Sequence, residues 1–254
     1  MPEAALAAAS AVARVLDDCL CWQGTGFLIS NRLFLTNNHV IPNAEKAKDF
    51  FIEFNYELKN KKTPKAATRF GLSPKRLFVS SPEEELDFTV VAVGKRDFGE
   101  GKLSDFGFCP LKSTPDKHAI DTLANIIGHP KGRFKQTSLC NNLVVAQNDE
   151  VLQYYSHTEV GSSGSPVFND KFEVIALHHW GTPTRKAFTS QGSQVPKGTK
   201  EGIRISAIIN RLNDKKADLK YQQLKLIETA LNYGFSQPSL LRKKHLADEN
   251  DLKF

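Results

Sequence analysis

Short apolar segments rich in β-branched and aromatic residues, bounded by Gly, Pro, Asn or Asp, recur along most of this chain. Such a pattern is typical of all-β sandwiches and barrels. The predicted strands are Cys19–Ile29, Leu33–Thr36, Phe50–Tyr56, Arg76–Ser80, Phe88–Val93, Leu123–Ile127, Gln136–Leu139, Leu143–Gln147, Val151–His157, Pro166–Phe168, Val174–His179 and Gly202–Ile205. A connector rich in Gly, Pro and Asp, from about Gly94 to Asp116, divides them into two groups. The pattern therefore predicts two β modules.

The two ends of the chain have a different pattern. Residues 1–16 are rich in alanine and lack a basic leader, which indicates a short surface helix rather than a secretory signal. Residues 206–212 and 214–233 have helical spacing, and Gly234 is placed to end the second helix. One face of that helix carries Tyr221, Leu224, Ile227 and Leu231. We expect a helical tail that packs on the barrels or docks another subunit.

Composition excludes some classes of function. No apolar run is long enough to span a membrane. The net charge of +6 and pI near 9.0 raise nucleic acid as a partner. However, the basic clusters at 59–65 and 242–244 are not interleaved with aromatic residues, as a stacking platform would be. Solvated surface is therefore the favoured interpretation, and neither a membrane nor a nucleic acid is expected as a partner.

The four cysteines are Cys19, Cys21, Cys109 and Cys140. The first two alternate along a predicted strand, so we expect both side chains on one side of it. Metal binding would need two more soft ligands at suitable spacing, and none is near. We therefore expect no metal site, buried and reduced thiols, and a cytoplasmic protein.

Three polar side chains stand at the ends of predicted strands. Ser163 lies in Gly-Ser-Ser-Gly-Ser-Pro (161–166), where glycines permit a tight turn that presents a hydroxyl and aims backbone N–H groups at one point. His39 follows the strand Leu33–Thr36, and Asp87 opens the strand Phe88–Val93. These residue types are those of a nucleophile, a general base and its orienting carboxylate.

In this order of His, Asp and Ser, the chain resembles the trypsin-like serine endopeptidases of the chymotrypsin fold. Gly24–Ser30 before the histidine and Val174–Gly181 after the serine fit the family as well. The resemblance runs from about Trp22 to about Leu212, most of the chain.

The resemblance implies an all-β protein of two six-stranded antiparallel β-barrels, with a short N-terminal helix and a helical C-terminal tail. The protease domain would cover 19–212, with a first barrel at about 19–100 and a second at about 117–206. Residues 1–18 would form the helical N-terminal segment and 213–254 the C-terminal extension. The active site would lie at the seam, with His39 and Asp87 from the first barrel and Ser163 from the second.

The resemblance also implies the roles of these residues, without a cofactor. His39 would take the proton of the Ser163 hydroxyl, Asp87 would orient the imidazole, and the backbone N–H groups of Gly161 and Ser163 would form the oxyanion hole. Plainer interpretations are an ordinary turn serine, a core histidine, and an aspartate that belongs to a solvated acidic loop. Ser162 and Ser165 are less suited as nucleophiles than Ser163, because the family motif places the attacking serine between two small residues.

Specificity is suggested by two positions shared with the bacterial glutamyl-endopeptidase branch. Thr158 lies five residues before Ser163 and His178 fifteen after it, and with His157 they would line the primary pocket. An imidazole, especially a protonated one, and a hydroxyl can bind a carboxylate, so we expect cleavage after an acidic residue.

Two further predictions concern the strand that carries His178. The alternative to a role in specificity is that His178 and His179 alternate on a strand, one in the core and one in solvent. His179, Trp180 and Gly181 would form the edge that pairs with an extended peptide substrate.

Regulation is the least constrained property. Family members activated by proteolysis carry an aspartate before the serine, and here Ser162 stands there. A neutral hydroxyl does not hold a buried ammonium, so the oxyanion loop must be ordered by other contacts or by a partner. Resembling bacterial proteins serve as effector proteases beside partner proteins in antiviral defence, which implies a co-encoded activator or substrate. The alternative is a catalytically silent or partner-activated module that binds peptides or proteins.

Overall fold

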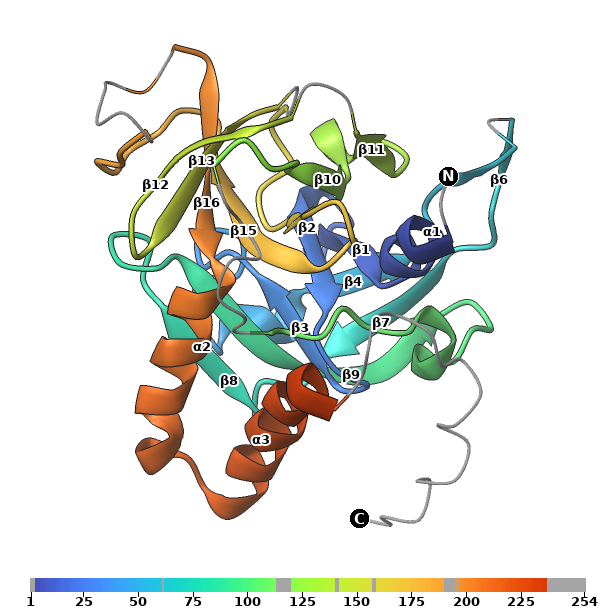
Figure 1. Ribbon diagram of the computed structural model, residues 1–254. Helices are drawn as coiled ribbons and strands as arrows, with labels where there is room; N and C mark the ends of the chain where they lie inside the picture. The colour runs from blue at the N-terminus through green and yellow to red at the C-terminus, as the bar shows by residue number, and fades with distance from the viewer. Residues whose placement is uncertain are drawn as a thin grey trace.

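The computed structural model describes residues 3–60, 62–112, 120–139, 142–156, 159–189, 195 and 197–236. Two antiparallel β-sheets, formed by the earlier and the later part of the chain, lie against one another, and helices stand at both ends of the chain (Figure 1). The prediction of an all-β protein with the chymotrypsin-like fold is confirmed. Within the described residues, no helix has both the length and the apolar character needed to cross a bilayer.

The first sheet closes into a six-stranded barrel. In spatial order its strands are β3 (Leu33–Thr36), β2 (Trp22–Leu28), β1 (Val12–Leu16), β4 (Phe51–Phe54), β7 (Thr68–Leu72) and β9 (Phe88–Phe98), with β8 (Phe78–Ser81) added on β9. Pairing of β3 with β9 closes the barrel. Phe27, Leu35 and Val90 are paired across neighbouring strands, share one face of the sheet and are fully buried. A short hairpin of β5 (Leu58–Lys59) and β6 (Thr63–Pro64) extends from this module.

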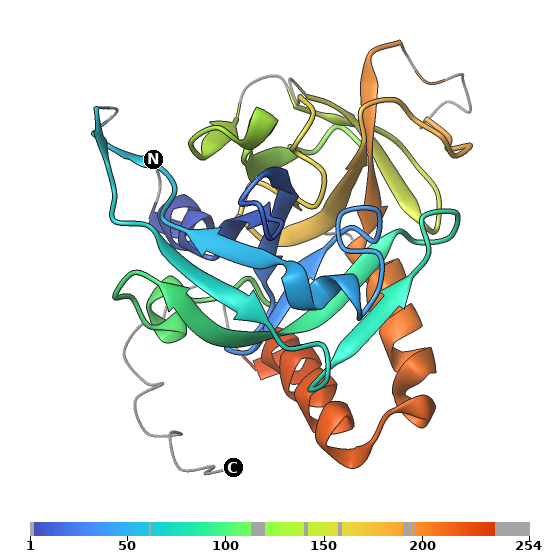
Figure 2. The same ribbon diagram turned by 180° about the vertical axis from the view of Figure 1, so that it is seen from behind.

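The second sheet is a half-barrel, so the prediction of a second closed six-stranded barrel is corrected. Its spatial order is β11 (Gln136–Ser138), β10 (Asn125–Gly128), β14 (Pro166–Phe168), β15 (Val174–Trp180), β16 (Thr199–Arg204), β13 (Val151–Tyr155) and β12 (Val144–Gln147). Its two sides are linked by an isolated bridge between Leu123 and Leu143 and by a main-chain hydrogen bond from Asp121 to Val144 at 2.8 Å. Seen from behind, this sheet stacks on the first barrel along one seam (Figure 2).

The N-terminal segment differs from the predicted surface helix. Helix α1 covers only Glu3–Ser10, and Val12–Leu16 forms β1, which pairs with β2 and β4 in the middle of the first sheet. The β-branched residues of this segment favour a strand. Ala5 and Ala8 are buried, because their small side chains allow the helix to pack closely on the barrel. The first barrel therefore begins at Val12, inside the segment predicted to be helical.

The cysteines also differ from the prediction. Cys19 and Cys21 are exposed in the turn before β2 rather than buried on a strand. Cys109 is buried, and this burial raises the pKa of its thiol to about 12. Cys140 lies outside the described residues.

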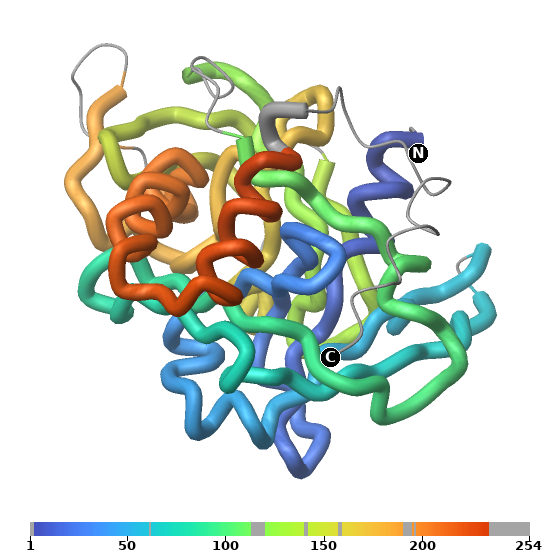
Figure 3. Tube along the Cα trace, turned by 90° about the horizontal axis from the view of Figure 1, so that it is seen from below, coloured from blue at the N-terminus to red at the C-terminus, as the bar shows by residue number. Residues whose placement is uncertain are grey.

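The C-terminal helices pack on the chain's own barrel. Helix α2 (Ile205–Asp214) follows β16 and contacts β15 and β16 of the half-barrel, and helix α3 (Tyr221–Ser236) lies below the first module (Figures 1 and 3). Ile227 and Leu231 are buried within the cluster that holds the barrel core, whereas Tyr221, predicted on the same face, is 70% exposed. Helix α3 continues beyond Gly234 to Ser236. The apolar face that could dock a partner is thus used internally. Short 3-10 helices occur at Lys46–Asp49, Leu103–Phe106, Pro130–Gly132 and Lys215–Asp218.

Candidate active site

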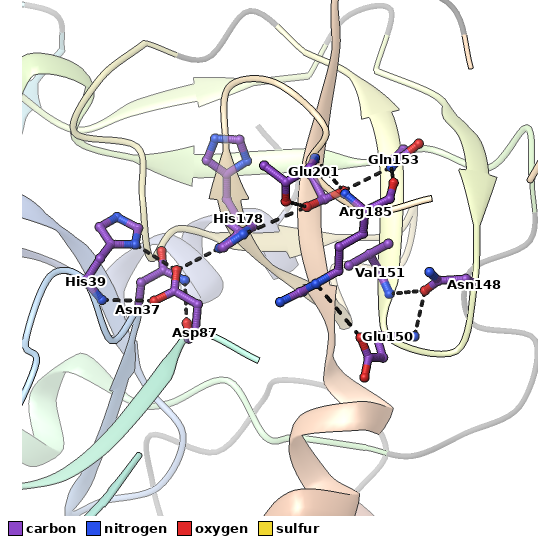
Figure 4. A network of polar contacts seen from close by, with 12 residues as sticks. Asn37, His39, Asp87, Asn148, Glu150, Val151, Gln153, His178, Arg185 and Glu201 are labelled. Atoms are coloured by element: carbon purple, nitrogen blue, oxygen red, sulfur yellow. Dashed lines mark hydrogen bonds and ion pairs between the residues drawn. The ribbon is translucent and has the colours of Figure 1, made fainter. Parts of the chain in front are cut away.

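The register of β3 and β9 brings His39 and Asp87 together. Thr36, at the end of β3, pairs with Thr89 of β9. In an antiparallel pair, the residues that follow one strand meet those that precede the other. His39 Nδ1 lies 2.7 Å from Asp87 Oδ2, and the His39 backbone N–H donates to Asp87 Oδ1 at 2.9 Å. Figure 4 shows the two side chains pointing toward one another.

Asp87 is fully buried, and its hydrogen-bond donors keep its carboxyl group ionised. Burial by itself pushes the pKa of its carboxyl up, but hydrogen bonds from His179 and His39 outweigh it and hold the pKa below the ordinary value. The residue has a φ of 39°, a left-handed conformation, and Asn37 Nδ2 donates to its carbonyl oxygen at 2.9 Å. Because the carboxylate only accepts, His39 donates from Nδ1 and its Nε2 is left to accept a proton.

The turn that carries Ser163 is fastened to the first barrel. The Thr25 backbone N–H donates to the Ser163 carbonyl at 2.9 Å. A Cβ on Gly24 would lie 3.1 Å from that carbonyl oxygen and 2.8 Å from the side chain of Val40, the residue after His39. The serine turn and the histidine loop therefore meet at Gly24. Gly164 has a φ of +84°, and a Cβ there would lie 2.0 Å from the Thr25 carbonyl oxygen, so only glycine fits.

Exposure distinguishes the three serines of the turn. Ser162 and Ser165 are buried, at 3% and 0% exposure, whereas Ser163 is half-buried. No hydrogen bond between Ser163 Oγ and the His39 ring is among the contacts of the described residues. Such bonds are commonly long in enzymes without substrate.

The backbone beside Ser163 has the pattern of an anion cradle. Ser162, Gly164 and Ser165 donate their N–H groups to main-chain carbonyls, but within the described part of the chain Gly161 and Ser163 do not. The Val160 carbonyl accepts the Lys131 N–H at 2.6 Å. Since the peptide bond is trans, the Gly161 N–H points the opposite way, away from Lys131.

Two polar contacts support this orientation. The Glu159 carboxylate pairs with Lys131 at 3.0 Å and with Arg133, which joins the loop after β10 to the segment before the serine. The Gly161 carbonyl accepts the Thr25 hydroxyl at 2.9 Å. Contacts within this chain thus hold the loop, which is one of the two alternatives that the neutral Ser162 left open.

The two histidines on β15 are both buried, so the alternative of one buried and one solvated side chain is wrong. His178 is 3% exposed, and its Nδ1 lies 2.7 Å from the Tyr154 hydroxyl. Burial, with the nearby charges of His179, Lys200 and His39, lowers the pKa of His178 to about 3. It is neutral near pH 7 and offers no imidazolium to a substrate carboxylate.

His179 contacts the candidate triad instead of solvent. Its Nδ1 lies 2.7 Å from Asp87 Oδ2, and its Nε2 lies 3.8 Å from Oε1 of the buried Glu201. The donor atoms of His39, Asp87 and His179 are close enough to share a metal ion, although the Nδ1 atoms of both histidines are already engaged with Asp87.

Trp180 and Gly181 lie at an open strand edge. β15 pairs with β14 as far as Leu177, and among the described strands none continues on that side beyond it. The Trp180 ring stacks on His39, with centroids 5.3 Å apart, and remains 37% exposed. Such an edge can accept an extended peptide. His157 and Thr158, predicted to line the pocket, lie outside the described residues.

Sequence patterns missed three residues that support the site, namely Thr25, Lys131 and Glu201. Thr25 stands between two glycines, which was a signal of close backbone approach. Lys131 has a φ of 53°, and Glu201 is a fully buried carboxylate. Neither property has a signature in a single sequence.

The fold and this site define the class of the chymotrypsin-like serine proteases. Residues 24–177 match the trypsin-like peptidase domain, and the chain belongs to that family. It is 44% identical over 197 residues to the uncharacterized protein y4fB of Sinorhizobium fredii. That similarity covers 72% of this chain but only 30% of the relative, so the chain spans less than a third of that relative's length.

Two solved structures share the fold. A serine endoprotease from Yersinia pestis aligns with a TM-score of 0.56 and 19% identity over 84% of this chain and 64% of that chain. An inactive mutant of Rv3671c from M. tuberculosis H37Rv aligns with a TM-score of 0.54 and 15% identity, over 86% and 92%. At these identities the likeness concerns the fold alone.

Proposed function

We propose that the protein is a serine endopeptidase that cleaves protein substrates through an acyl-enzyme. The observation that carries the proposal is the His39–Asp87 hydrogen bond at 2.7 Å, at a seam where Ser163 is the most exposed serine of its turn. His39 Nε2 takes the hydroxyl proton as Ser163 Oγ attacks the carbonyl carbon. The proton then passes to the leaving amine, and water releases the acyl group by the same route.

The oxyanion of the tetrahedral intermediate is stabilised by the N–H groups of Gly161 and Ser163. The proposal is supported by their lack of other acceptors within the described chain and by the fixed orientation of the Val160–Gly161 peptide. Loss of one such donor costs about 3 kcal/mol in transition-state stabilisation in related chemistry.

We still propose that the protein cleaves after an acidic residue, but we assign the positive charge that attracts this residue to Lys200 instead of His178. A neutral His178 contributes at most an uncharged hydrogen bond. Lys200 supports the preference, because its Nζ donates to the Gly181 carbonyl at 3.0 Å, at the substrate edge. Peptides with Glu, Phe, Leu or Arg at the cleavage site test it. We expect Glu to be fastest and Lys200→Met to remove that advantage, and fastest cleavage after Arg would contradict it.

We also propose a cytoplasmic role beside a partner protein in bacterial defence. In support, the similar region of the Sinorhizobium relative occupies only 30% of a longer protein, so such a module occurs joined to further sequence. Labelling of Ser163 with and without co-expressed neighbouring gene products tests the need for a partner. If no neighbouring gene product changes the rate of Ser163 labelling, the result contradicts the need for a partner.

The test of the main proposal is labelling by a fluorophosphonate probe, followed by mapping of cut sites in a proteome. Ser163→Ala is expected to abolish both. Ser165→Ala is the matched control, because its hydroxyl is buried and has no hydrogen-bond partner among the described residues, so its removal is close to neutral. Absence of labelling in the folded wild-type protein would favour a silent binding module instead.

A further inference from the structure

Asp87 Oδ2 is shared by two histidines from different sheets. His39 belongs to the first barrel and His179 to β15 of the half-barrel, and each Nδ1 lies 2.7 Å from the same oxygen. The carboxylate is fully buried and its pKa lies below the ordinary value, so it is ionised and accepts from both rings. Asp87 Oδ2 therefore accepts a hydrogen bond from each of two imidazole rings, while Oδ1 accepts the His39 backbone N–H.

The other side of His179 is fixed by a second buried carboxylate. Nε2 lies 3.8 Å from Glu201 Oε1, and the Thr184 hydroxyl donates to the same Glu201 oxygen at 2.8 Å. The Arg185 N–H also donates to Glu201, at 3.1 Å (Figure 4). Gln153 Nε2 adds a hydrogen bond at 3.0 Å. The ring of His179 is thus confined between Asp87 and the segment that follows the substrate edge.

We infer that His179 is a positioning residue that orients Asp87 and limits the basicity that Asp87 confers on His39, rather than a substrate contact. This inference rests on the proposed function of the site. At 1% exposure, His179 is not accessible to a peptide. Each donor to a carboxylate weakens its attraction for the other, so removal of His179 strengthens the pull of Asp87 on the His39 proton. His39 then holds its proton to higher pH.

The charged groups around His179 do not reverse this sign. Asp87 and His39 face it from the first barrel, Glu201 from β16, and the neutral His178 precedes it on β15. Substitution of His179 leaves the two carboxylates in place, and both favour a protonated His39.

The test uses the rate of fluorophosphonate labelling of Ser163 as a function of pH, which needs no known substrate. For His179→Ala we expect labelling about tenfold slower near pH 7. In the plot of labelling rate against pH, we expect the midpoint of the acidic limb to lie about half a pH unit to one pH unit higher than in wild type. His179→Asn keeps an amide N–H at the position of Nδ1, so we expect a rate within about threefold and an unmoved limb. Ser30→Ala, which removes a buried hydroxyl in the β2–β3 turn, controls for general loss of stability.

A purely structural role would slow labelling without moving the limb and would overturn the inference. Because the alanine variant can fail to fold, NMR of the 15N-histidine-labelled wild type gives an independent result. We expect two downfield Nδ1–H protons, both of which shift when Ser163 carries the phosphonate, and a single responsive proton would refute the shared oxygen. A folded wild type that does not label but shows both protons would refute the proposed function and leave the His179–Asp87 contact established.

Discussion

The buried His178 makes stability depend on pH in a predictable direction. Its pKa is about 3 in the folded protein, against 6.5 for an ordinary histidine. Between these values the unfolded chain binds a proton that the folded protein does not. Stability is therefore fully present above about pH 6.5 and is lost as the pH falls toward 3.

The magnitude follows from the size of the shift. Each unit of pH inside the window costs about 1.4 kcal/mol. A pH of about 5 lies about 1.5 units below the ordinary histidine pKa of 6.5. At that pH, His178 therefore lowers the free energy of unfolding by about 2 kcal/mol.

The assay is urea unfolding at about pH 7.5 and pH 5, for wild type and His178→Asn. The asparagine does not titrate, and its amide can still bond the Tyr154 hydroxyl. His129, whose pKa burial also lowers, is present in both proteins and cancels in the comparison. We expect wild type to lose about 2 kcal/mol more than the variant on acidification. Equal losses would refute a neutral His178, and a smaller loss in wild type would indicate the imidazolium that an acid-binding histidine requires.

Three further predictions concern the seam and the tail. Gly164→Ala, at φ +84° with backbone 2.0 Å from the new Cβ, is expected to destabilise the fold by about 3 kcal/mol or more and abolish labelling, and a stable, active variant would contradict the turn geometry. Thr25→Val removes the hydroxyl that bonds the Gly161 carbonyl and the His129 N–H, so we expect a loss of about 2 kcal/mol in urea unfolding and slower labelling, both restored by Thr25→Ser. Ile227→Ala should cost about 2–4 kcal/mol and Tyr221→Ala less than about 0.5, and equal small effects would show that α3 does not pack on the barrel.

The strands that position the histidine and the serine were predictable because they are short, apolar and bounded by turn residues. Leu33–Thr36 and Pro166–Phe168 occur with the predicted bounds. Strand β7 was missed because Arg69 and Gly71 interrupt its apolar pattern. β1 was missed because its five residues follow an alanine-rich helix. Local patterns do not register a boundary between two such short elements.

The burial of β15 shows a second limit of sequence patterns. Alternation predicts one solvated face, but both faces of this strand are covered where the two sheets meet. His178 is covered by Tyr154 of the half-barrel and His179 by Asp87 of the first barrel. Only the tertiary arrangement decides this, and the same holds for the buried Glu201, whose partners come from β13 and from the segment after β15.

The two halves of the site are assembled by different interactions. The β3–β9 register inside one closed barrel brings His39 and Asp87 together, and the half-barrel adds the hydrogen bond from His179 to the same Asp87 oxygen. Among the described residues, the Ser163 turn is joined to the first barrel by contacts across the seam, such as the hydrogen bonds of Thr25 to Ser163 and Gly161. A shift of one sheet against the other would leave His39 and Asp87 joined and displace Ser163, the proposed nucleophile. We therefore expect substitutions at the seam to affect the position of Ser163 more than substitutions inside either module.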